Sequence, residues 1–280
     1  VAVSMIPAVF SYRYIERPFR KLRTGSTKTK IVAGLALVIV PALMLFGLDF
    51  LKIQTRQNYG NVYASTELHG CDFMNDVCVV GEYTATQKIL LYGDSHIYQL
   101  IPIFVDYTKT HDVQITTCAL VCNGEQYSTI KDGTFAPGKF DLVINSFKTN
   151  SEELSREVRL DLATTFSQFA MDRGAKHLIV LDNPFYAESI APRRIRLPDL
   201  APLPRADQDA VANPITQDWK DDAGEGTFFY DPFAVLCNST DCPLEQDGKV
   251  LYLDNNHLSM AGVQLLEPSL INMVNQILAQ

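Results

Sequence analysis

The 280-residue sequence lacks the short motifs that mark most nucleotide, dinucleotide and zinc-protease sites. It contains no Gly-x-x-x-x-Gly-Lys-Ser/Thr loop, no Gly-x-Gly-x-x-Gly turn and no His-Glu-x-x-His pair. Its histidines are few and widely spaced: His69, His96, His111, His177 and His257. We therefore predict that the soluble part of the chain binds no metal and no cofactor.

Positive charge is scarce except in one segment near the N-terminus. Residues 11–30 hold seven Lys or Arg and a single acid, Glu16. Residues 1–30 carry +6, which leaves −14 for the remainder of a chain whose formal net charge is −8. A basic segment in an acidic chain is compatible with nucleic-acid binding. The uncharged run beside it favours a membrane flank instead, so we predict a membrane partner and no nucleic acid.

Charged residues are absent from the 18 residues Ile31–Leu48. As a helix this run would be about 27 Å long, close to the hydrocarbon thickness of a bilayer. We predict a transmembrane helix over residues 31–50, with residues 1–30 in the cytoplasm and the later residues outside, because basic residues flank the cytoplasmic end of a span. Residues 1–10 are interpreted as the end of an earlier membrane helix. The alternative, a signal peptide over residues 13–48, lacks a small-residue cleavage site soon after the apolar run.

Six cysteines fall into three close pairs. In an exported domain such pairs predict local disulfides, although six cysteines formally allow 15 pairings. Unpaired buried thiols are the alternative, and a zinc site is disfavoured because no Cys-x-x-Cys spacing occurs. The predicted disulfides are Cys71–Cys78, Cys118–Cys122 and Cys237–Cys242.

Apolar strands alternate with helical patterns in the second part of the chain. The predicted strands cover residues 88–92, 113–117, 140–145 and 177–181, and the predicted helices cover residues 97–110 and 151–172. This alternation is typical of a parallel sheet with helices on both faces, whose sites lie at the carboxyl ends of the strands. We therefore place a catalytic domain at residues 86–280 and interpret residues 51–85 as a linker or extension between it and the membrane.

Residues 183–222 interrupt this alternation because they contain six prolines. Loops of such length are uncommon unless they have a function. One interpretation is a lid or glycan-binding wall, and the other is a surface excursion without a role in substrate binding. The candidate contacts in the first case are Tyr186, Arg193, Arg194, Arg196 and Trp219.

A serine follows the first predicted strand at a sharp turn. The strand ends at Gly93, and Asp94 and Ser95 follow it. Far downstream, Asp254 stands three residues before His257, just ahead of a C-terminal helical pattern. A serine nucleophile needs a base that accepts its proton, and the base needs a carboxylate that orients it. We predict these three roles for Ser95, His257 and Asp254. The alternative is a loop-capping aspartate and a histidine packed on the last helix.

The two neighbours of this serine are predicted to be structural. Adjacent residues in a turn usually point apart, and Asp94 is well placed to cap the helix that begins near His96. At the start of that helix, the backbone N–H of Ser95 can point at an oxyanion.

Two parts of the sequence resemble a known family. The segment Gly93–His96 (Gly-Asp-Ser-His) and the Asp254-x-x-His257 pair resemble the first and last blocks of the SGNH (GDSL-like) hydrolase and acyltransferase superfamily. The segment Ser11–Arg20 is similar to the motif that closes the membrane part of acyltransferase-3 proteins with a fused periplasmic SGNH domain. The resemblance implies a three-layer αβα, flavodoxin-like SGNH fold. It also implies that residues 1–30 end a membrane acyltransferase region, and that the protein lies in the inner membrane with its SGNH domain in the periplasm.

The same resemblance implies a function. Such proteins O-acetylate bacterial surface glycans, including O-antigen sugars of lipopolysaccharide, with acetyl-CoA as the ultimate donor through the membrane domain. We therefore expect an O-acetyltransferase that works through a serine acyl-enzyme. Its expected partners are a lipid-linked or polymeric surface glycan and its own membrane acyltransferase domain. A carbohydrate acetyl esterase and a glycan-binding module with a non-catalytic SGNH fold are the alternatives.

The superfamily pattern also implies a Gly and an Asn as oxyanion donors besides Ser95. By spacing, Asn150 takes the place of that Asn, although Lys148 stands where the superfamily has a Gly. Asn145 is the second candidate, and Lys148 is an alternative source of positive charge at the site. Gly124 is the candidate for the separate Gly block.

Overall fold

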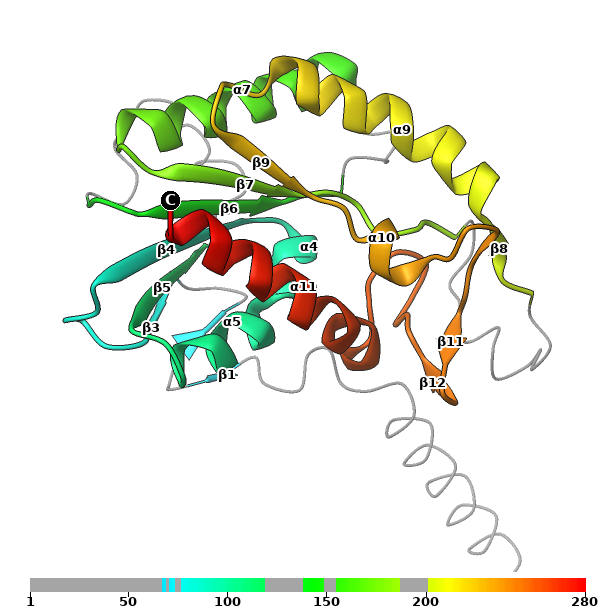
Figure 1. Ribbon diagram of the computed structural model, residues 1–280, viewed down its shortest axis with the longest axis horizontal. Helices are drawn as coiled ribbons and strands as arrows, with labels where there is room; N and C mark the ends of the chain where they lie inside the picture. The colour runs from blue at the N-terminus through cyan, green and yellow to red at the C-terminus, as the bar shows by residue number, and fades with distance from the viewer. Residues whose placement is uncertain (1–66, 69–70, 74–76, 119–137, 149–154, 187–200) are drawn as a thin grey trace, which may run out of the picture. The chain divides into compact units, whose positions relative to one another are not determined.

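The computed structural model describes residues 67–68, 71–73, 77–118, 138–148, 155–186 and 201–280 (Figure 1). All of them belong to one compact unit, Asn58–Gln280. The predicted membrane span over residues 31–50 lies outside the described residues. Within the described part of the chain, no helix combines the length and the apolar character needed to cross a bilayer.

A six-stranded sheet forms the centre of the unit, in the order β3-β5-β4-β6-β7-β9. Its strands are β3 (Cys78–Val80), β4 (Gln87–Gly93), β5 (Val113–Cys118), β6 (Leu142–Ser146), β7 (Lys176–Val180) and β9 (Thr227–Tyr230). All neighbours in the sheet are parallel except β3 and β5. The predicted α/β class with a mostly parallel sheet is confirmed, and only the edge strand β3 departs from the parallel pattern.

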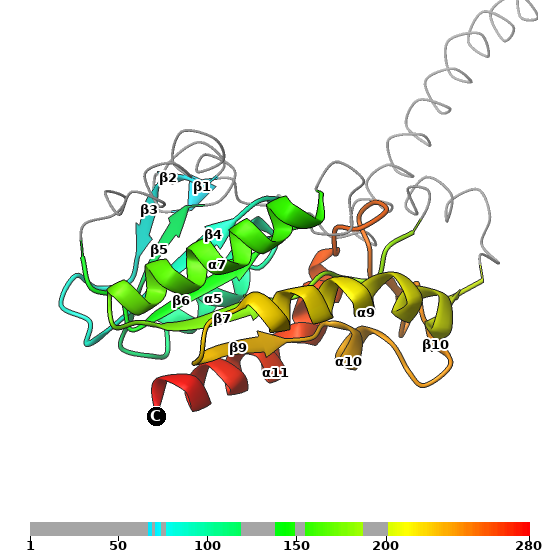
Figure 2. The same ribbon diagram turned by 90° about the horizontal axis from the view of Figure 1, so that it is seen from above.

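Helices cover both faces of the sheet, as Figures 1 and 2 show. One face packs against α5 (Ile101–Thr108) and α11 (Met260–Leu278), and the other packs against α7 (Arg156–Asp172) and α9 (Arg205–Asp222). In β4, Ile89 and Leu91 belong to the first core cluster, whereas Leu90 and Tyr92 belong to the second. Because both faces of β4 are buried, its residues Ile89–Tyr92 form an apolar run without alternation.

The long helices begin at serine caps. The Ser155 hydroxyl accepts a hydrogen bond from the Val158 N–H and starts α7, whereas the predicted start was Ser151. The Ser259 hydroxyl accepts from the Gly262 N–H and starts α11. The predicted helix over residues 97–110 is two helices, the short α4 (Ser95–Tyr98) and α5.

Helix α9 occupies much of the segment that was predicted to be irregular. Pro214 lies inside this helix and is exposed. A proline in a helix interior costs about 3 kcal/mol, so tertiary packing must hold α9 in place. Asp218 of α9 forms an ion pair with Arg156 of α7 at 2.8 Å, and Trp219 is buried in the core that α7 and α9 share. The prediction of an irregular loop is therefore wrong for residues 205–222.

Two aromatic residues that were candidates for glycan binding are core residues instead. Trp219 is 2% exposed and Tyr186 is 5% exposed. The ring of Tyr186 packs edge-on against Tyr252, with 4.7 Å between the ring centroids. The three candidate arginines lie outside the described residues.

The sheet extends N-terminally beyond the predicted domain boundary at residue 86. Residues 78–80, within the predicted linker 51–85, form the edge strand β3 beside β5. The predicted disulfide Cys71–Cys78 is confirmed and joins this strand to the preceding segment.

The predicted disulfide Cys237–Cys242 is also confirmed. Cys118 is disulfide-bonded, and its predicted partner, Cys122, lies outside the described residues.

The remaining elements are short. Three antiparallel pairs are formed by β1 (Glu67–Leu68) with β2 (Cys71–Asp72), β8 (Leu203–Pro204) with β10 (Asp241–Cys242), and β11 (Glu245–Gln246) with β12 (Lys249–Val250). The helix α10 (Phe233–Leu236) follows β9.

Candidate active site

The turn after β4 is fixed by close backbone packing. The Asp94 N–H donates to the Ser146 carbonyl oxygen at 3.3 Å, which holds the turn against the end of β6. A Cβ atom at Gly93 would collide with that same carbonyl oxygen. Only glycine allows the two strands to approach this closely, and this fixes where the following serine emerges.

The Asp94 carboxylate joins the turn to the neighbouring strand. Its Oδ1 accepts from the His96 N–H at 2.8 Å and caps α4, as predicted. Its Oδ2 accepts from the Lys148 N–H at 2.8 Å. The carboxylate therefore holds together two loops that meet at the carboxyl edge of the sheet.

Ser95, His257 and Asp254 form a continuous hydrogen-bonded chain. His257 Nε2 lies 2.6 Å from Ser95 Oγ, and His257 Nδ1 lies 2.6 Å from Asp254 Oδ2. An ionised carboxylate only accepts hydrogen bonds, so Nδ1 carries the proton and Nε2 is left to accept from the serine hydroxyl. The structure thus brings together the three residues predicted as nucleophile, base and orienting acid.

The Asp254 carboxylate is held in its ionised form. Burial raises its pKa, but hydrogen bonds from the His257 ring and from the backbone N–H groups of Asn256 and His257 outweigh this effect and bring the pKa to about 2. The two backbone bonds are 2.9 and 2.8 Å long. An ionised Asp254 can stabilise an imidazolium on His257, and both side chains remain partly exposed, at 33% and 17%.

A network of long-range contacts fixes the loop that carries the acid and the base. The Leu258 N–H donates to Gln99 Oε1 at 2.7 Å, and the Tyr186 N–H donates to the Asn255 carbonyl at 2.8 Å. Gln99 follows α4, so this contact ties the loop directly to the serine turn. The sequence offered no signal for these contacts, because a buried glutamine after a short helix matches no motif.

A second histidine, His96, lies beside this chain. It is 1% exposed, and its ring is 5.4 Å from that of His257 between centroids. Its Nδ1 lies 3.2 Å from Asp182 Oδ1. Burial lowers the pKa of His96, but the Asp182 carboxylate beside the ring, helped by the charge of Asp94, outweighs burial and raises the pKa overall.

The structure describes only some of the predicted oxyanion donors. The backbone N–H of Ser95 lies at the first position of α4, whereas Asn150 and Gly124 lie outside the described residues. The second candidate, Asn145, is fully buried, and its side chain donates to the Tyr92 carbonyl and contacts His177 Nε2 at 2.6 Å. Asn145 is therefore a core residue and does not reach the serine.

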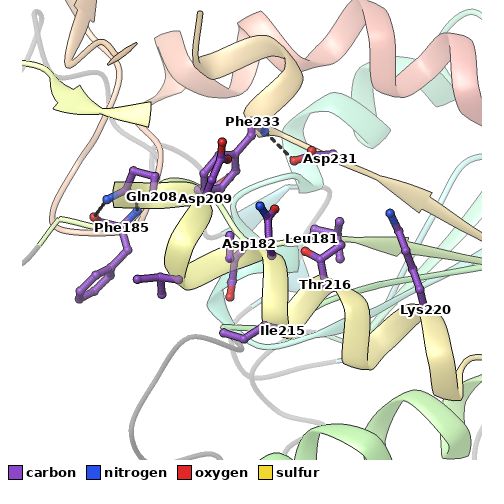
Figure 3. Close-up of a pocket in the computed structure, with 14 residues that line it drawn as sticks. Leu181, Asp182, Phe185, Gln208, Asp209, Ile215, Thr216, Lys220, Asp231 and Phe233 are labelled. Atoms are coloured by element: carbon purple, nitrogen blue, oxygen red, sulfur yellow. Dashed lines mark hydrogen bonds between the residues drawn. The ribbon is translucent and has the colours of Figure 1, made fainter. Parts of the chain in front are cut away.

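A cavity of about 120 Å³ lies along the same edge of the sheet, between α9 and the residues that follow β7 and β9 (Figure 3). Its lining combines carboxylates, amides and two phenylalanines, including Asp182, Asn183, Phe185, Asp209, Asp231 and Phe233. The Gln208 side chain bonds both the N–H and the carbonyl of Phe185, at 2.7 and 2.9 Å, and fixes this wall to α9. Asp182 belongs both to the cavity wall and to the surroundings of His96. Among the described residues, no three His, Cys, Asp or Glu side chains are arranged to hold a metal ion.

Comparison with known families places part of the chain in one of them. A family described as "SGNH domain (fused to AT3 domains)" matches residues 126–272, just over half of the chain. No curated protein sequence matches the chain.

Solved structures are similar to the chain only at low identity. A protein from Slackia heliotrinireducens assigned as an SGNH hydrolase is 16% identical, with a TM-score of 0.45 over 66% of this chain and 96% of that one. A protein from Streptococcus pneumonia assigned as a platelet activating factor is 15% identical, with a TM-score of 0.46 over 86% and 98% of the two chains. The salicylyl-acyltransferase SsfX3 from a tetracycline biosynthetic pathway is 16% identical, with a TM-score of 0.38 over 67% and 54%. Likeness at this level says nothing of activity.

The packing at Gly93 generates a prediction. In Gly93→Ala the new Cβ must push away the Ser146 carbonyl or the Ile97 side chain, so the serine turn shifts. We expect hydrolysis of p-nitrophenyl acetate by the full chain to fall about 100-fold, the order expected for a displacement of 1 Å. The control is Gly138→Ala, because a Cβ there meets no atom within 4 Å. Equal rates for the two variants would contradict this account of the turn.

Proposed function

The chain belongs to the family of SGNH domains that are fused to AT3 domains, and from this premise we propose that it is an O-acyltransferase that works through a serine acyl-enzyme. Ser95 is the nucleophile, His257 the general base and Asp254 the group that orients it. The observation that carries the proposal is the hydrogen-bonded chain from the Ser95 hydroxyl through His257 to Asp254, with both bonds at 2.6 Å.

Acyl transfer through Ser95, His257 and Asp254 takes two steps. In the first, Ser95 Oγ attacks the carbonyl carbon of the acyl donor while His257 Nε2 takes the hydroxyl proton. The resulting oxyanion accepts from the Ser95 backbone N–H, and collapse of the tetrahedral intermediate expels the leaving group, which receives the proton from His257. In the second step, an acceptor hydroxyl loses its proton to His257 and attacks the carbonyl carbon of the ester on Ser95. Collapse of this second tetrahedral intermediate breaks the bond to Ser95 Oγ, which takes the proton back from His257, and releases the acylated acceptor.

The transferred group is acetyl and the acceptor is a bacterial surface polysaccharide, such as an O-antigen sugar. Acetyl groups come from acetyl-CoA through a membrane acyltransferase region, of which the motif at residues 11–20 is the end. The SGNH domain itself holds no cofactor and lies in the periplasm, anchored to the inner membrane by the span at residues 31–50. An anchored enzyme meets lipid-linked glycan at a raised effective concentration, which favours transfer.

The cavity along the carboxyl edge of the sheet supports a glycan as the acceptor. Carboxylates and amides, here Asp182, Asn183 and Asp231, accept from and donate to sugar hydroxyls, and the faces of Phe185 and Phe233 suit the apolar face of a sugar ring. The cavity opens along the edge of the sheet where β7 and β9 end. Strands lie about 4.8 Å apart, so it is within a few strand spacings of the end of β4, where Ser95 stands.

A carbohydrate acetyl esterase is the second candidate, because its chemistry differs only in that water attacks the ester on the serine. The fusion to AT3 domains in this family favours transfer. A glycan-binding module is disfavoured by the intact contacts between Ser95, His257 and Asp254.

Replacement of the nucleophile is the first test. Ser95→Ala in the full-length protein should abolish acetylation of the surface glycan, because no acyl-enzyme forms, while the thermal unfolding temperature stays unchanged. The acetyl signals of the purified glycan in the NMR spectrum measure this. Ser155→Ala, which alters only the cap of α7, should leave acetylation intact. Undiminished acetylation by Ser95→Ala would exclude the serine route.

Replacement of the orienting acid is the second test. In Asp254→Asn the side chain no longer fixes the Nδ1–H tautomer of His257, and the turnover rate on a small acetyl ester should fall by up to about 10⁴-fold. The Asp254 pKa of about 2 means that the carboxylate is ionised throughout the neutral range. The deficit should therefore be measurable at neutral pH, where the wild-type carboxylate is ionised and orients His257. A negligible loss would show that another group orients the base.

A further inference from the structure

The amide side chain and backbone of Asn256 connect three parts of the site. Asn256 is 2% exposed and stands between Asp254 and His257 in the sequence. Its N–H donates to Asp254 Oδ1 at 2.9 Å, and its carbonyl accepts from Asn183 Nδ2 at 3.1 Å. Its side-chain Nδ2 lies 3.0 Å from His96 Nε2. Asn256, which separates the acid from the base in the sequence, is therefore held through its backbone N–H, its carbonyl and its side-chain amide.

The ring of His96 is oriented for its bond to Asn256. Its Nδ1 lies 3.2 Å from Asp182 Oδ1, so the carboxylate favours a proton on Nδ1. When the ring is neutral with its proton on Nδ1, it presents an unprotonated Nε2, which accepts from the Asn256 amide at 3.0 Å. The backbone N–H of His96 is fixed separately by Asp94, so both the main chain and the ring of His96 are held.

The two buried histidines of the sheet region differ in their surroundings. His177 is 3% exposed and contacts Asn145 at 2.6 Å, and burial lowers its pKa to about 3. His96 is equally buried but lies against a carboxylate and against the loop that carries His257. A histidine that only filled core space would not need the carboxylate or the contact with Asn256.

We propose that His96 is a positioning residue: held by Asp182, it bonds the Asn256 side chain and thereby fixes the Asp254–His257 loop against Ser95. The proposal rests on the proposed function, since it assigns a role within the same acyl transfer. His96 adjoins Ser95 in the chain and contacts the loop 160 positions away, so this side chain joins the serine turn directly to the loop that carries the base.

Two isosteric replacements separate this role from packing. The amide of asparagine overlays Nδ1 of histidine, so His96→Asn keeps a donor for Asp182 and loses the bond to Asn256. The amide of glutamine reaches the position of Nε2, so His96→Gln keeps an acceptor for Asn256. We expect His96→Asn to lower kcat on p-nitrophenyl acetate by about 10- to 100-fold, as a misplaced base does, with KM little changed. His96→Gln should stay close to the wild-type value.

A second pair of variants tests the same bond from its other end. Asn256→Ala removes the side chain and leaves both backbone bonds, and should lower kcat as much as His96→Asn does. The double variant, His96→Asn with Asn256→Ala, should lose no more kcat than either single variant, because the two substitutions remove the same interaction. His177→Gln is the matched control for replacing a buried histidine and should keep kcat. Thermal unfolding of each variant reports whether it is folded.

The outcomes distinguish this inference from the proposed function. If Ser95→Ala abolishes ester hydrolysis while His96→Asn and His96→Gln lose equal activity, the positioning role is wrong and the serine route stands. If Ser95→Ala keeps full hydrolysis, the proposed function itself fails. Should His96→Asn not fold, Asn256→Ala decides the matter, and an unchanged kcat in that variant overturns the role of His96.

Discussion

The hydrogen bond of 2.6 Å between the Ser95 hydroxyl and His257 Nε2 joins segments 162 positions apart, and the rest of the site depends on it. The bond exists because the sheet fixes both ends. On one side, Gly93 lets β4 end against the Ser146 carbonyl. On the other, α11 buries one face in the core and presents the preceding loop to the serine turn. The interior of the domain therefore sets the distance across which a proton has to move.

Each of the two imidazole rings near the serine, those of His257 and His96, lies against a carboxylate. Asp254 orients His257, and Asp182 plays the equivalent part for His96. Asp182 also lines the cavity that we propose for the acceptor glycan. This one side chain therefore belongs both to the proposed acceptor site and to the contacts of His96, which bonds the loop of Asp254 and His257.

The sequence predicted the elements whose pattern is local. Apolar runs such as residues 89–92 located the central strands to within about two residues, in keeping with the ordinary uncertainty of element boundaries. Close cysteine pairs predicted two disulfides that are confirmed. Helix α9 was missed because the prolines of residues 183–222 argued against a helix, whereas the burial of Trp219 and the Asp218 ion pair with α7 stabilise it. Contacts such as those of Gln99 and Asn256 follow from tertiary packing, which no spacing along the chain encodes.

The central claim is that Ser95 is an activated nucleophile, and covalent labelling of the full chain with a fluorophosphonate tests it most directly, because such reagents phosphonylate serines that have a working base. Peptide mass mapping should place one phosphonyl group on Ser95 in the wild-type protein and none in His257→Ala. Labelling of Ser95 that persists in His257→Ala, or its absence from a wild-type protein that acetylates its glycan, would contradict the account.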